Sequence, residues 1–422
     1  MMNKIIKERL ALIQSGTIPH GYKKTKAGIM PEDWDGAVRA KDVFKNYTDK
    51  KHNGDLEILA ATQENGIVPR SQIGIDIQCS EEGVNGYKKV SKGDFVISLR
   101  SFQGGIEYSE YDGIVSPAYT VLQPVREISD GYYRNYFKTD SFIQRLNGAV
   151  YGIRDGKQIG YQDFGDMCIY YPPIDEQKKI AEVLSCCDRV IELKQQLIAE
   201  LQRLKSGFLQ AMFPAKGHSE PVIRFPEFSD AWEQRKFSDF TWDAGKRNKD
   251  NLDLVPYAIT NEHGFIPQNE AHDEFGYMKD TDRRAYNIVE PKSFAYNPAR
   301  INVGSLGYYE GSENVIVSSL YEVFKTAEYV DDRFLWHWLK SPELPKWIGK
   351  LQEGSVRLYF YYDKLCECIL RMPSIDEQRK IAKYLDNLDH LITLHQRELE
   401  ETKKKKKSLA KLLLTGSVRV PT

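Results

Sequence analysis

The sequence predicts an α+β protein with a pseudo-two-fold internal repeat, in which two similar domains are joined by two long antiparallel coiled-coil helices. Three observations lead to this fold class. The segment 174–181 returns almost unchanged as 375–382, an offset of 375 − 174 = 201 residues. Each copy opens a stretch of heptad-spaced apolar residues. Each stretch follows a region of short strand-like runs separated by glycine-rich turns. Self-similarity at a fixed offset indicates a duplicated architecture.

The repeat extends beyond these eight residues in both directions. Thr62–Pro69 is echoed by Thr260–Pro267, an offset of 260 − 62 = 198, and 114–116 by 316–318, an offset of 316 − 114 = 202. Downstream, four positions of the first helix are matched at the offset of 201: Leu184, Asp188, Ile191 and Leu193, which recur as Leu385, Asp389, Ile392 and Leu394. The intervening residues diverge. We therefore expect one fold used twice with different surface loops.

Length and composition suit two domains in a reducing compartment. A chain of 422 residues with 41% hydrophobic residues can bury two cores. No stretch approaches the ~20 apolar residues of a membrane span, and the charged start lacks the core of a signal peptide. The six cysteines form no CxxC pair, which suits the cytoplasm. A net charge of −1 argues against a uniformly basic DNA wrapper, but local basic patches remain compatible with DNA binding.

Proline and glycine positions divide the chain. Pro172-Pro173 closes the first domain, Pro373 closes the second, and Gly416 ends the last helix. Ser374 and Glu377 have the spacing of a capping box. The predicted limits are a first domain at 1–172, a first helix at 173–213, a linker at 214–225, a second domain at 226–372, a second helix at 373–416 and a tail at 417–422.

The apolar stripes of both helices have the spacing of coiled-coil seams. Each helix, at about 40 residues, would be about 60 Å long, which exceeds a small domain and favours a spacer over the alternative of ordinary bundle helices. Lys194 and His395 interrupt the two stripes at the same place. The predicted seam positions are Leu184, Cys187, Ile191, Ile198 and Leu201 in the first helix, and Leu385, Leu388, Ile392 and Leu399 in the second. Val190, Leu197 and Leu204 widen the first stripe, so that helix could contact more than its partner helix.

Connectivity fixes the direction of the pairing. The second domain follows the end of the first helix by a short linker and directly precedes the start of the second helix. The start of the second helix should therefore lie near the end of the first, and the pair should be antiparallel. We expect the two domains to be related by a pseudo-two-fold axis.

Catalytic motifs are missing from the sequence. It contains no G-x-x-x-x-G-K-[ST] loop and no G-x-G-x-x-G after a strand. Asn297-Pro298-Ala299-Arg300 lacks the second proline and the aromatic residue of the amino-methyltransferase motif. The histidines show no metal-ligand spacing, and the acids at 175–176 and 376–377 suit helix starts, where the dipole favours them. The sequence predicts no active site, metal site or bound cofactor.

At this point the residues resemble a known family. Two divergent domains, each followed by a Pro-(Pro/Ser)-Ile-Asp-Glu-Gln-(Lys/Arg)-Lys-Ile-Ala helix, are similar to the specificity subunit of type I restriction–modification systems. Phe225-Pro226-Glu227-Phe228, leading to Trp232, fits the entry to the second domain. The resemblance covers nearly the whole chain.

The resemblance implies separate roles for the two domains, the two helices and the partner subunits. The two domains would be target-recognition domains, each reading one half of a split site in double-stranded DNA. The helices would set the gap between the halves and dock two methyltransferase subunits, which restriction (translocase) subunits then join. The specificity subunit itself would be non-catalytic and without a membrane partner. S-adenosylmethionine, ATP and Mg would belong to the partner subunits.

Candidates for DNA contact are polar residues on loops between strand-like runs. Arginine suits guanine, asparagine or glutamine suits adenine, and lysine suits phosphate. In the first domain they are Arg70, Arg100, Ser101, Gln103, Arg154 and Lys157, and in the second Asn297, Arg300, Asn302 and Arg357. Arg154 and Arg357 fall at similar places in the two halves. For each candidate a solvated or structural role stays open. The lysine run 403–407 could likewise be a solvated face or contact phosphates or a partner.

Two other functions remain open from the sequence. A self-contained DNA-modifying enzyme would modify or cut DNA as a purified chain, but the nucleotide and S-adenosylmethionine motifs are missing. A coiled-coil scaffold that does not bind DNA would leave a reconstituted complex without sequence preference, but a scaffold needs no divergent loops.

Overall fold

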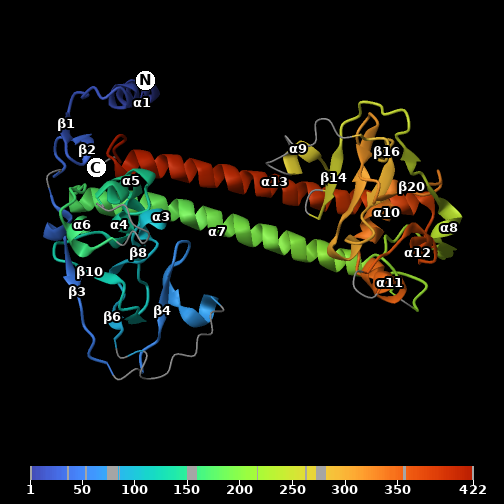
Figure 1. Ribbon diagram of the computed structural model, residues 1–422, viewed down its shortest axis with the longest axis horizontal. Helices are drawn as coiled ribbons and strands as arrows, with labels where there is room; N and C mark the ends of the chain where they lie inside the picture. Colours follow the sequence, from blue (N-terminus) through green and yellow to red (C-terminus); the bar gives the residue numbers. More distant parts are fainter. Residues whose placement is uncertain are drawn as a thin grey trace. The chain divides into compact units, whose positions relative to one another are not determined.

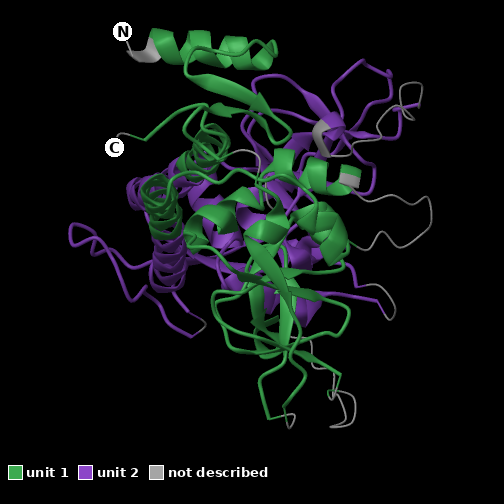
Figure 2. Ribbon diagram, turned by 90° about the vertical axis from the view of Figure 1, so that its left-hand side faces the viewer, with its two compact units in different colours: residues 1–194, 398–422 green, residues 195–397 purple. Residues whose placement is uncertain are grey.

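The computed structural model describes residues 2–35, 38–52, 55–73, 84, 86–149, 159–215, 217–261, 264–271, 282–354 and 358–420. The chain forms two compact units, shown in Figure 2: unit 1 contains residues 1–194 and 398–422, and unit 2 contains residues 195–397. Both long helices are divided between the units, whereas the predicted domain limits treat each helix as its own segment, so those limits stay a prediction. Within the described ranges, no helix has the length and apolar character required to cross a membrane.

Unit 1 is built on a four-stranded antiparallel sheet. In spatial order its strands are β3 (Phe44–Tyr47), β10 (Thr120–Pro124), β7 (Phe95–Ile97) and β8 (Glu107–Tyr108). Three two-stranded pairs accompany it: β1 (Tyr22–Thr25) with β2 (Gly28–Pro31), β4 (Leu59–Thr62) with β5 (Gly66–Pro69), and β6 (Lys88–Val90) with β9 (Gly113–Val115). The helices of this domain are α1 (Met2–Gln14), α3 (Ser101–Gly104), α4 (Asp130–Tyr136), α5 (Asp140–Ala149) and α6 (Tyr161–Gly165), with short 3-10 turns η1 (Ala40–Asp42) and η2 (Arg70–Ile73).

Unit 2 repeats the strand order of this four-stranded sheet and differs from unit 1 in its smaller sheets. Its four-stranded sheet has the order β12 (Thr241–Asp243), β20 (Glu322–Thr326), β17 (Ser293–Tyr296) and β18 (Leu306–Tyr309). The smaller sheets are β14 (Tyr257–Thr260) with β15 (Gly264–Pro267), β13 (Lys246–Arg247) with β16 (Asn287–Val289) and β19 (Val315–Val317), and β11 (Glu233–Lys236) with β21 (Ile369–Met372). The short helices are α8 (Phe237–Phe240), α9 (Gln268–Ala271), η4 (Ile301–Val303), α10 (Asp332–Leu339), α11 (Glu343–Leu351) and α12 (Tyr362–Cys366).

Even single contacts recur between the two sheets. Phe95 pairs with Tyr108 in unit 1, and Phe294 pairs with Tyr308 in unit 2. The hydroxyl of each tyrosine donates to the first aspartate of the next helix, Asp130 at 3.0 Å and Asp332 at 2.8 Å. The predicted duplication of one α+β fold is confirmed.

The two long helices are α7 (Ile174–Ala211) and α13 (Ile375–Leu414), labelled in Figure 1. Within unit 1, Lys194 Nζ lies 2.8 Å from Glu398 Oε2, and Lys406 pairs with Asp188. Within unit 2, Lys205 Nζ lies 2.5 Å from Asp389 Oδ1. The last two pairs are the same pair at the repeat offset of 201, since 188 + 201 = 389 and 205 + 201 = 406. In both units the start of one helix lies against the end of the other, which confirms the antiparallel pairing.

The seam positions differ in how completely they are covered. Leu184 and Leu385 are fully buried, and Ile198, Leu388, Ile392 and Leu399 are nearly so. Cys187, Ile191 and Leu201 are only partly buried. The ends of the helices belong to the domain cores: Leu184 and Leu413 pack in the core of unit 1, and Leu209 and Leu385 in that of unit 2. Burial of such side chains, at about 25 cal/mol per Å² of apolar area, anchors each helix end to its domain.

The glutamine of the repeated segment fastens helix to domain. Gln177 Oε1 accepts the backbone N–H of Ser129 at 3.0 Å, and Gln177 Nε2 donates to the Pro172 carbonyl at 2.8 Å. Gln378 makes the same two bonds, with the N–H of Asp331 at 2.9 Å and the Pro373 carbonyl at 3.0 Å. Both side chains are buried. A buried amide with both ends satisfied fixes the angle at which the helix leaves the domain.

Candidate nucleic-acid interface

The structure places six of the sequence-predicted contact residues on one loop of each domain. Residues 98–106 connect β7 to β8 and carry Arg100, Ser101 and Gln103, while residues 297–305 connect β17 to β18 and carry Asn297, Arg300 and Asn302. Because β7 and β17 occupy the same position in their sheets, these are equivalent connections. We call them the β7–β8 and β17–β18 connections.

The β7–β8 connection is a tight turn with two exposed polar side chains. Arg100 and Gln103 are exposed. Ser101 is 1% exposed, and its hydroxyl accepts the N–H of Ser98 at 2.9 Å, so this side chain shapes the turn from inside. Gly105 closes it with φ +81, where a Cβ would collide with the Phe137 carbonyl, so only glycine fits. The turn therefore holds Arg100 and Gln103 on a rigid base.

The β17–β18 connection is built in a similar way. Asn297 is half-buried, and its Oδ1 accepts the N–H of Ala299 at 3.0 Å, which makes it part of the loop framework. Arg300 and Asn302 are exposed. Gly304, with φ +95, ends the turn. Each connection thus offers an arginine and an amide side chain to solvent.

The remaining candidates lie elsewhere. Arg70 begins η2, donates to the Tyr87 hydroxyl at 3.2 Å and lies over the Tyr87 ring at 5.8 Å, so its guanidinium is held by an aromatic neighbour. Arg154, Lys157 and Arg357 lie outside the described residues.

Sequence reasoning missed the two buried glutamates at the helix starts. Glu176 is buried, accepts from Trp34 Nε1 at 2.8 Å and pairs with Arg419 Nε at 2.6 Å. Arg419 also reaches Asp33 at 2.9 Å and, through its hydrogen bonds, lowers the pKa of that carboxyl. The segment after α13 thereby closes on the start of α7. We call Glu176 with Trp34 and Arg419 the unit 1 clasp.

Unit 2 contains the same arrangement. Glu377 is buried, pairs with Arg224 Nε at 2.8 Å and accepts from Trp232 Nε1 at 3.3 Å. The expected capping box is therefore wrong as to the carboxylate, which binds Arg224 and Trp232, whereas Ser374 Oγ does accept the Glu377 N–H at 3.5 Å. A signal existed in the sequence, since Trp34 and Trp232 are separated by 232 − 34 = 198 residues, an offset of the domain repeat. We call this group the unit 2 clasp.

One cluster in unit 2 has the composition of a metal site. One ligand atom each from His337, Asp386 and Asp389 lie within 4.8 Å of one another. Both carboxylates already have cationic partners: Arg333 Nη2 is 2.5 Å from Asp386, and Lys205 Nζ is 2.5 Å from Asp389. Burial alone would raise the pKa of Asp386, but hydrogen bonds from His337 and Arg333 lower it to about 2. A divalent cation would have to displace both, so the chemistry of the cluster fits an ion-pair network.

His337 should make the stability of unit 2 depend on pH. Burial lowers its pKa although Asp386, 2.8 Å from Nε2, opposes the shift, and its Nδ1 is buried without a hydrogen-bond partner among the described residues. The folded state then binds fewer protons than the unfolded state, in which the pKa of a histidine is about 6.5. The stability that unit 2 has with a neutral His337 is therefore fully present above that pH and decreases as the pH falls below it. The melting temperature measured from pH 8 to pH 5 should fall less steeply in His337→Gln than in the parent, and the exposed His390→Gln should leave the profile unchanged.

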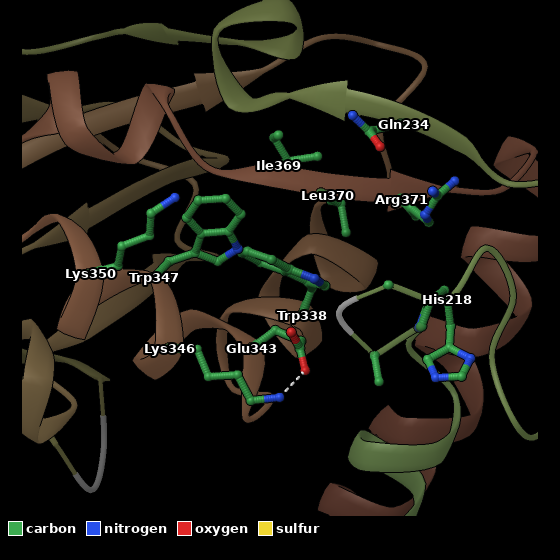
Figure 3. A pocket seen from close by; sticks show the side chains of 13 residues that line it. His218, Gln234, Trp338, Glu343, Lys346, Trp347, Lys350, Ile369, Leu370 and Arg371 are labelled. Carbon is green, nitrogen blue, oxygen red and sulfur yellow. Dashed lines mark hydrogen bonds and ion pairs between the residues drawn. The ribbon is translucent and has the colours of Figure 1, made fainter.

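The cavity in Figure 3, with a volume of about 310 Å³, lies at the edge of β11 and β21 in unit 2. Trp338, Trp347 and Leu370 form apolar walls, and Lys346 Nζ lies 2.6 Å from Glu343 Oε1 at the rim. Among the described residues, the lining brings no cysteine or serine nucleophile to His218, and no residue of the β17–β18 connection reaches it. Its chemistry is that of an apolar slot with a basic rim.

Comparison with known proteins identifies the family. Residues 31–203 and 260–404 match the type I restriction modification DNA specificity domain. The chain belongs to this family. The two matched regions fall on the two halves of the repeat, and the resemblance carried by the repeated helix starts is confirmed.

Within this family, similarity extends along nearly the whole chain. The MjaVIII type I restriction enzyme specificity subunit of Methanocaldococcus jannaschii is 24% identical over 429 residues, which cover 94% of this chain and 96% of that subunit. A solved chain from work on complex assembly and conformational transition of the type I R-M system aligns with a TM-score of 0.56 at 15% identity, covering 95% of this chain and 100% of that one. The similarity to this solved chain supports the fold.

Proposed function

We propose that this chain is the DNA sequence-specificity subunit of a type I restriction–modification complex, and that each domain reads one half of an asymmetric bipartite site. The observation that carries the proposal is the equivalent placement of two different sets of side chains. Arg100 and Gln103 are exposed on the β7–β8 connection, and Arg300 and Asn302 on the β17–β18 connection. A shared frame with different polar tips suits two readers of different sequences.

The chemistry of these tips matches base edges. A guanidinium can donate two hydrogen bonds to guanine, and a carboxamide can donate one hydrogen bond to adenine and accept another from it. The framework residues Ser101 and Asn297 bond their own turns, so they hold the tips in place. Contacts to phosphates would position each domain, and the tips would then discriminate bases.

Docking of partner subunits is the second part of the proposal. On α7, Val190 and Leu193 in unit 1 are 45% and 48% exposed, and Leu197 and Leu204 in unit 2 are 43% and 48% exposed. Large apolar side chains left in water on one helix favour burial against another protein. We assign them to two methyltransferase subunits, which restriction (translocase) subunits join. This chain would be non-catalytic and bind no cofactor, while S-adenosylmethionine, ATP and Mg serve the partners in the cytoplasm.

Mapping methylated adenines across the genome of a host that carries this chain and its methyltransferase subunit tests the proposal. We expect methylation in two short, different motifs separated by a gap of fixed length and free sequence. Methylation without sequence preference would contradict the reading function. Modification or cleavage of DNA by the purified chain alone would contradict the non-catalytic assignment.

Gln103→Ala should relax one base position of one half-site. Loss of a bidentate base contact costs about 1–3 kcal/mol of discrimination, roughly five- to 150-fold. Asn302→Ala should act in the same way on the other half-site, so each variant serves as the control for the other. The measurement is the frequency of methylation at every single-base variant of the site. Identical changes in both half-sites, or no change in either, would contradict the assignment of one connection to each half.

A further inference from the structure

A basic cleft of about 820 Å³ lies in unit 1 between the start of α5 and the last turns of α13. Among the described residues its lining contains one carboxylate, Asp140, and several polar or small side chains. Its charge comes from six lysines: Lys138, Lys403, Lys404, Lys406, Lys407 and Lys411. Such a concentration of one charge attracts an anion with several negative groups.

Three of these lysines are available to a ligand. Lys404, Lys407 and Lys411 are exposed and, at spacings of three and four, share one face of α13. Lys404 and Lys411 form no ion pair with any carboxylate of the described residues, and Lys407 lies 3.1 Å from Asp140 in a pair that is mostly exposed on both sides. An exposed ion pair of this kind contributes little to stability, so Lys407 can readily exchange Asp140 for a more highly charged anion. Lys406 and Lys138 are held by Asp188 and Glu107.

The fold does not require all of this charge, as the equivalent cleft of unit 2 demonstrates. A cleft at the equivalent place, about 720 Å³ in volume, is lined by Lys205 in the position of Lys406, since 205 + 201 = 406. Gln202 and Ser206 stand there where Lys403 and Lys407 stand in unit 1. The lining of that cleft also contains two further cations, Arg333 and Lys340, and two carboxylates, Glu310 and Asp389, beside aromatic side chains such as Trp336. At the same offset Lys411 corresponds to Gln210, since 210 + 201 = 411, whereas Lys404 corresponds to the basic Arg203, since 203 + 201 = 404. Lys403, Lys407 and Lys411 are therefore additions to a shared frame, which favours a role in binding.

The basic cleft adjoins the β7–β8 connection. Lys138, which lines the cleft, donates to the Gln63 carbonyl in the turn between β4 and β5 at 3.4 Å. The Gln63 side chain in turn lies against Gly104 of α3. The helix that forms one wall of the cleft, α5, also holds that connection, because Asn147 Nδ2 donates to the Phe102 carbonyl at 2.7 Å. DNA whose bases meet Arg100 and Gln103 would bring its backbone toward the cleft.

We propose that this cleft binds backbone phosphates of the double-stranded DNA that the β7–β8 connection reads, through Lys404, Lys407 and Lys411. The inference rests on the proposed function and adds a site to it. At 1.5 Å per residue the three lysines span about 10.5 Å of helix, which equals about three steps of 3.4 Å between successive phosphates of one strand, measured along the duplex axis. Contacts of this kind carry no sequence information and fix the register of the domain on the duplex.

Salt dependence of DNA binding tests the proposal in the complex of the full chain with its methyltransferase subunits. Each phosphate contact contributes about 0.9 to the slope of log affinity against log salt. Lys404→Gln should reduce that slope by about 0.9, and the triple variant Lys404→Gln, Lys407→Gln, Lys411→Gln by about 2.7. Between 50 and 200 mM salt, one lost contact is equivalent to about a 3.5-fold smaller drop in affinity. Asp140→Asn, which removes the carboxylate, should strengthen binding.

The neighbouring lysine provides the matched control. Lys405 is exposed, belongs to the same run and does not line the cleft, so Lys405→Gln should leave the slope unchanged. Lys404→Arg should retain the parent slope, which separates loss of charge from loss of fold. Equal slopes for the parent and the triple variant would overturn the proposal. Weaker complex assembly, with an unchanged slope for the complex that does assemble, would also overturn it, in favour of an acidic partner surface. A complex without any sequence preference would instead contradict the proposed function itself.

Discussion

Glu176→Ala should lower the free energy of unfolding of unit 1 by about 3 kcal/mol. The carboxylate is buried and is shared between Trp34 Nε1 and Arg419. Its removal leaves a buried indole N–H without an acceptor and a guanidinium with only Asp33 as partner. Breaking a buried pair from one side costs about 3–5 kcal/mol, and the partial exposure of Arg419 favours the lower value. Hydrogen exchange of the amides at 174–184 and 412–420 measures the local effect.

Asp175 supplies the control for this prediction. It is the adjacent acid in the same helical turn but is exposed, so Asp175→Ala should cost less than about 1 kcal/mol through the helix dipole. Glu377→Ala should loosen unit 2 in the same way, with Asp376→Ala as its control. If the variants at 175 and 176 proved equally mild, the clasp would not be the element that holds the helix start.

Adding one heptad to each of α7 and α13 should lengthen the tolerated gap between the half-sites. Seven residues keep the seam in register and add about 10.5 Å of helix, at most about three base pairs of DNA. Neither the β7–β8 nor the β17–β18 connection is touched, so the bases read in each half should stay the same. Mapping of methylated positions measures gap and half-sites together.

An insertion of four residues in α7 alone is the control for that experiment. The insertion shifts the apolar stripe of α7 against that of α13, so side chains such as Leu201 would leave the seam. We therefore expect the chain to fail to assemble with its methyltransferase subunits. Changed base preferences with an unchanged gap would contradict the spacer role of the helices.

The duplicated fold was readable from the sequence because its signals are local or periodic. Heptad spacing and the recurrence of 174–181 predicted the two long helices, and the connectivity of the chain predicted that they are antiparallel. Glu176 was misjudged for the opposite reason: its partners Trp34 and Arg419 are distant in sequence, so it looked like an ordinary acid at a helix start.

The predicted DNA-contact residues show the same difference between what local sequence reveals and what depends on distant parts of the chain. Arg100 and Ser101 are neighbours of equal promise in the sequence, yet the first is exposed and the second is buried in its own turn. Which side of a turn faces water depends on the strands that hold it. The sequence did suggest Asn297, Arg300 and Asn302 as counterparts of the first-domain candidates, but it did not show that both sets lie on the same connection of the sheet, because strand order is set by long-range pairing.

The unit 1 clasp also sets an order of events during protein synthesis. Unit 2 is formed by one continuous stretch, 195–397, whereas unit 1 needs 398–422 to be complete. Besides Arg419, the Gly416 carbonyl accepts from the Tyr22 hydroxyl at 2.8 Å, so residues synthesised after the whole of unit 2 complete the unit whose first residues were synthesised before it. The second half of the sequence therefore encodes the first unit that can close, and the start of unit 1 stays unfastened until residues 412–420 have been synthesised. A message truncated before codon 412 would yield a closed unit 2 and an open unit 1.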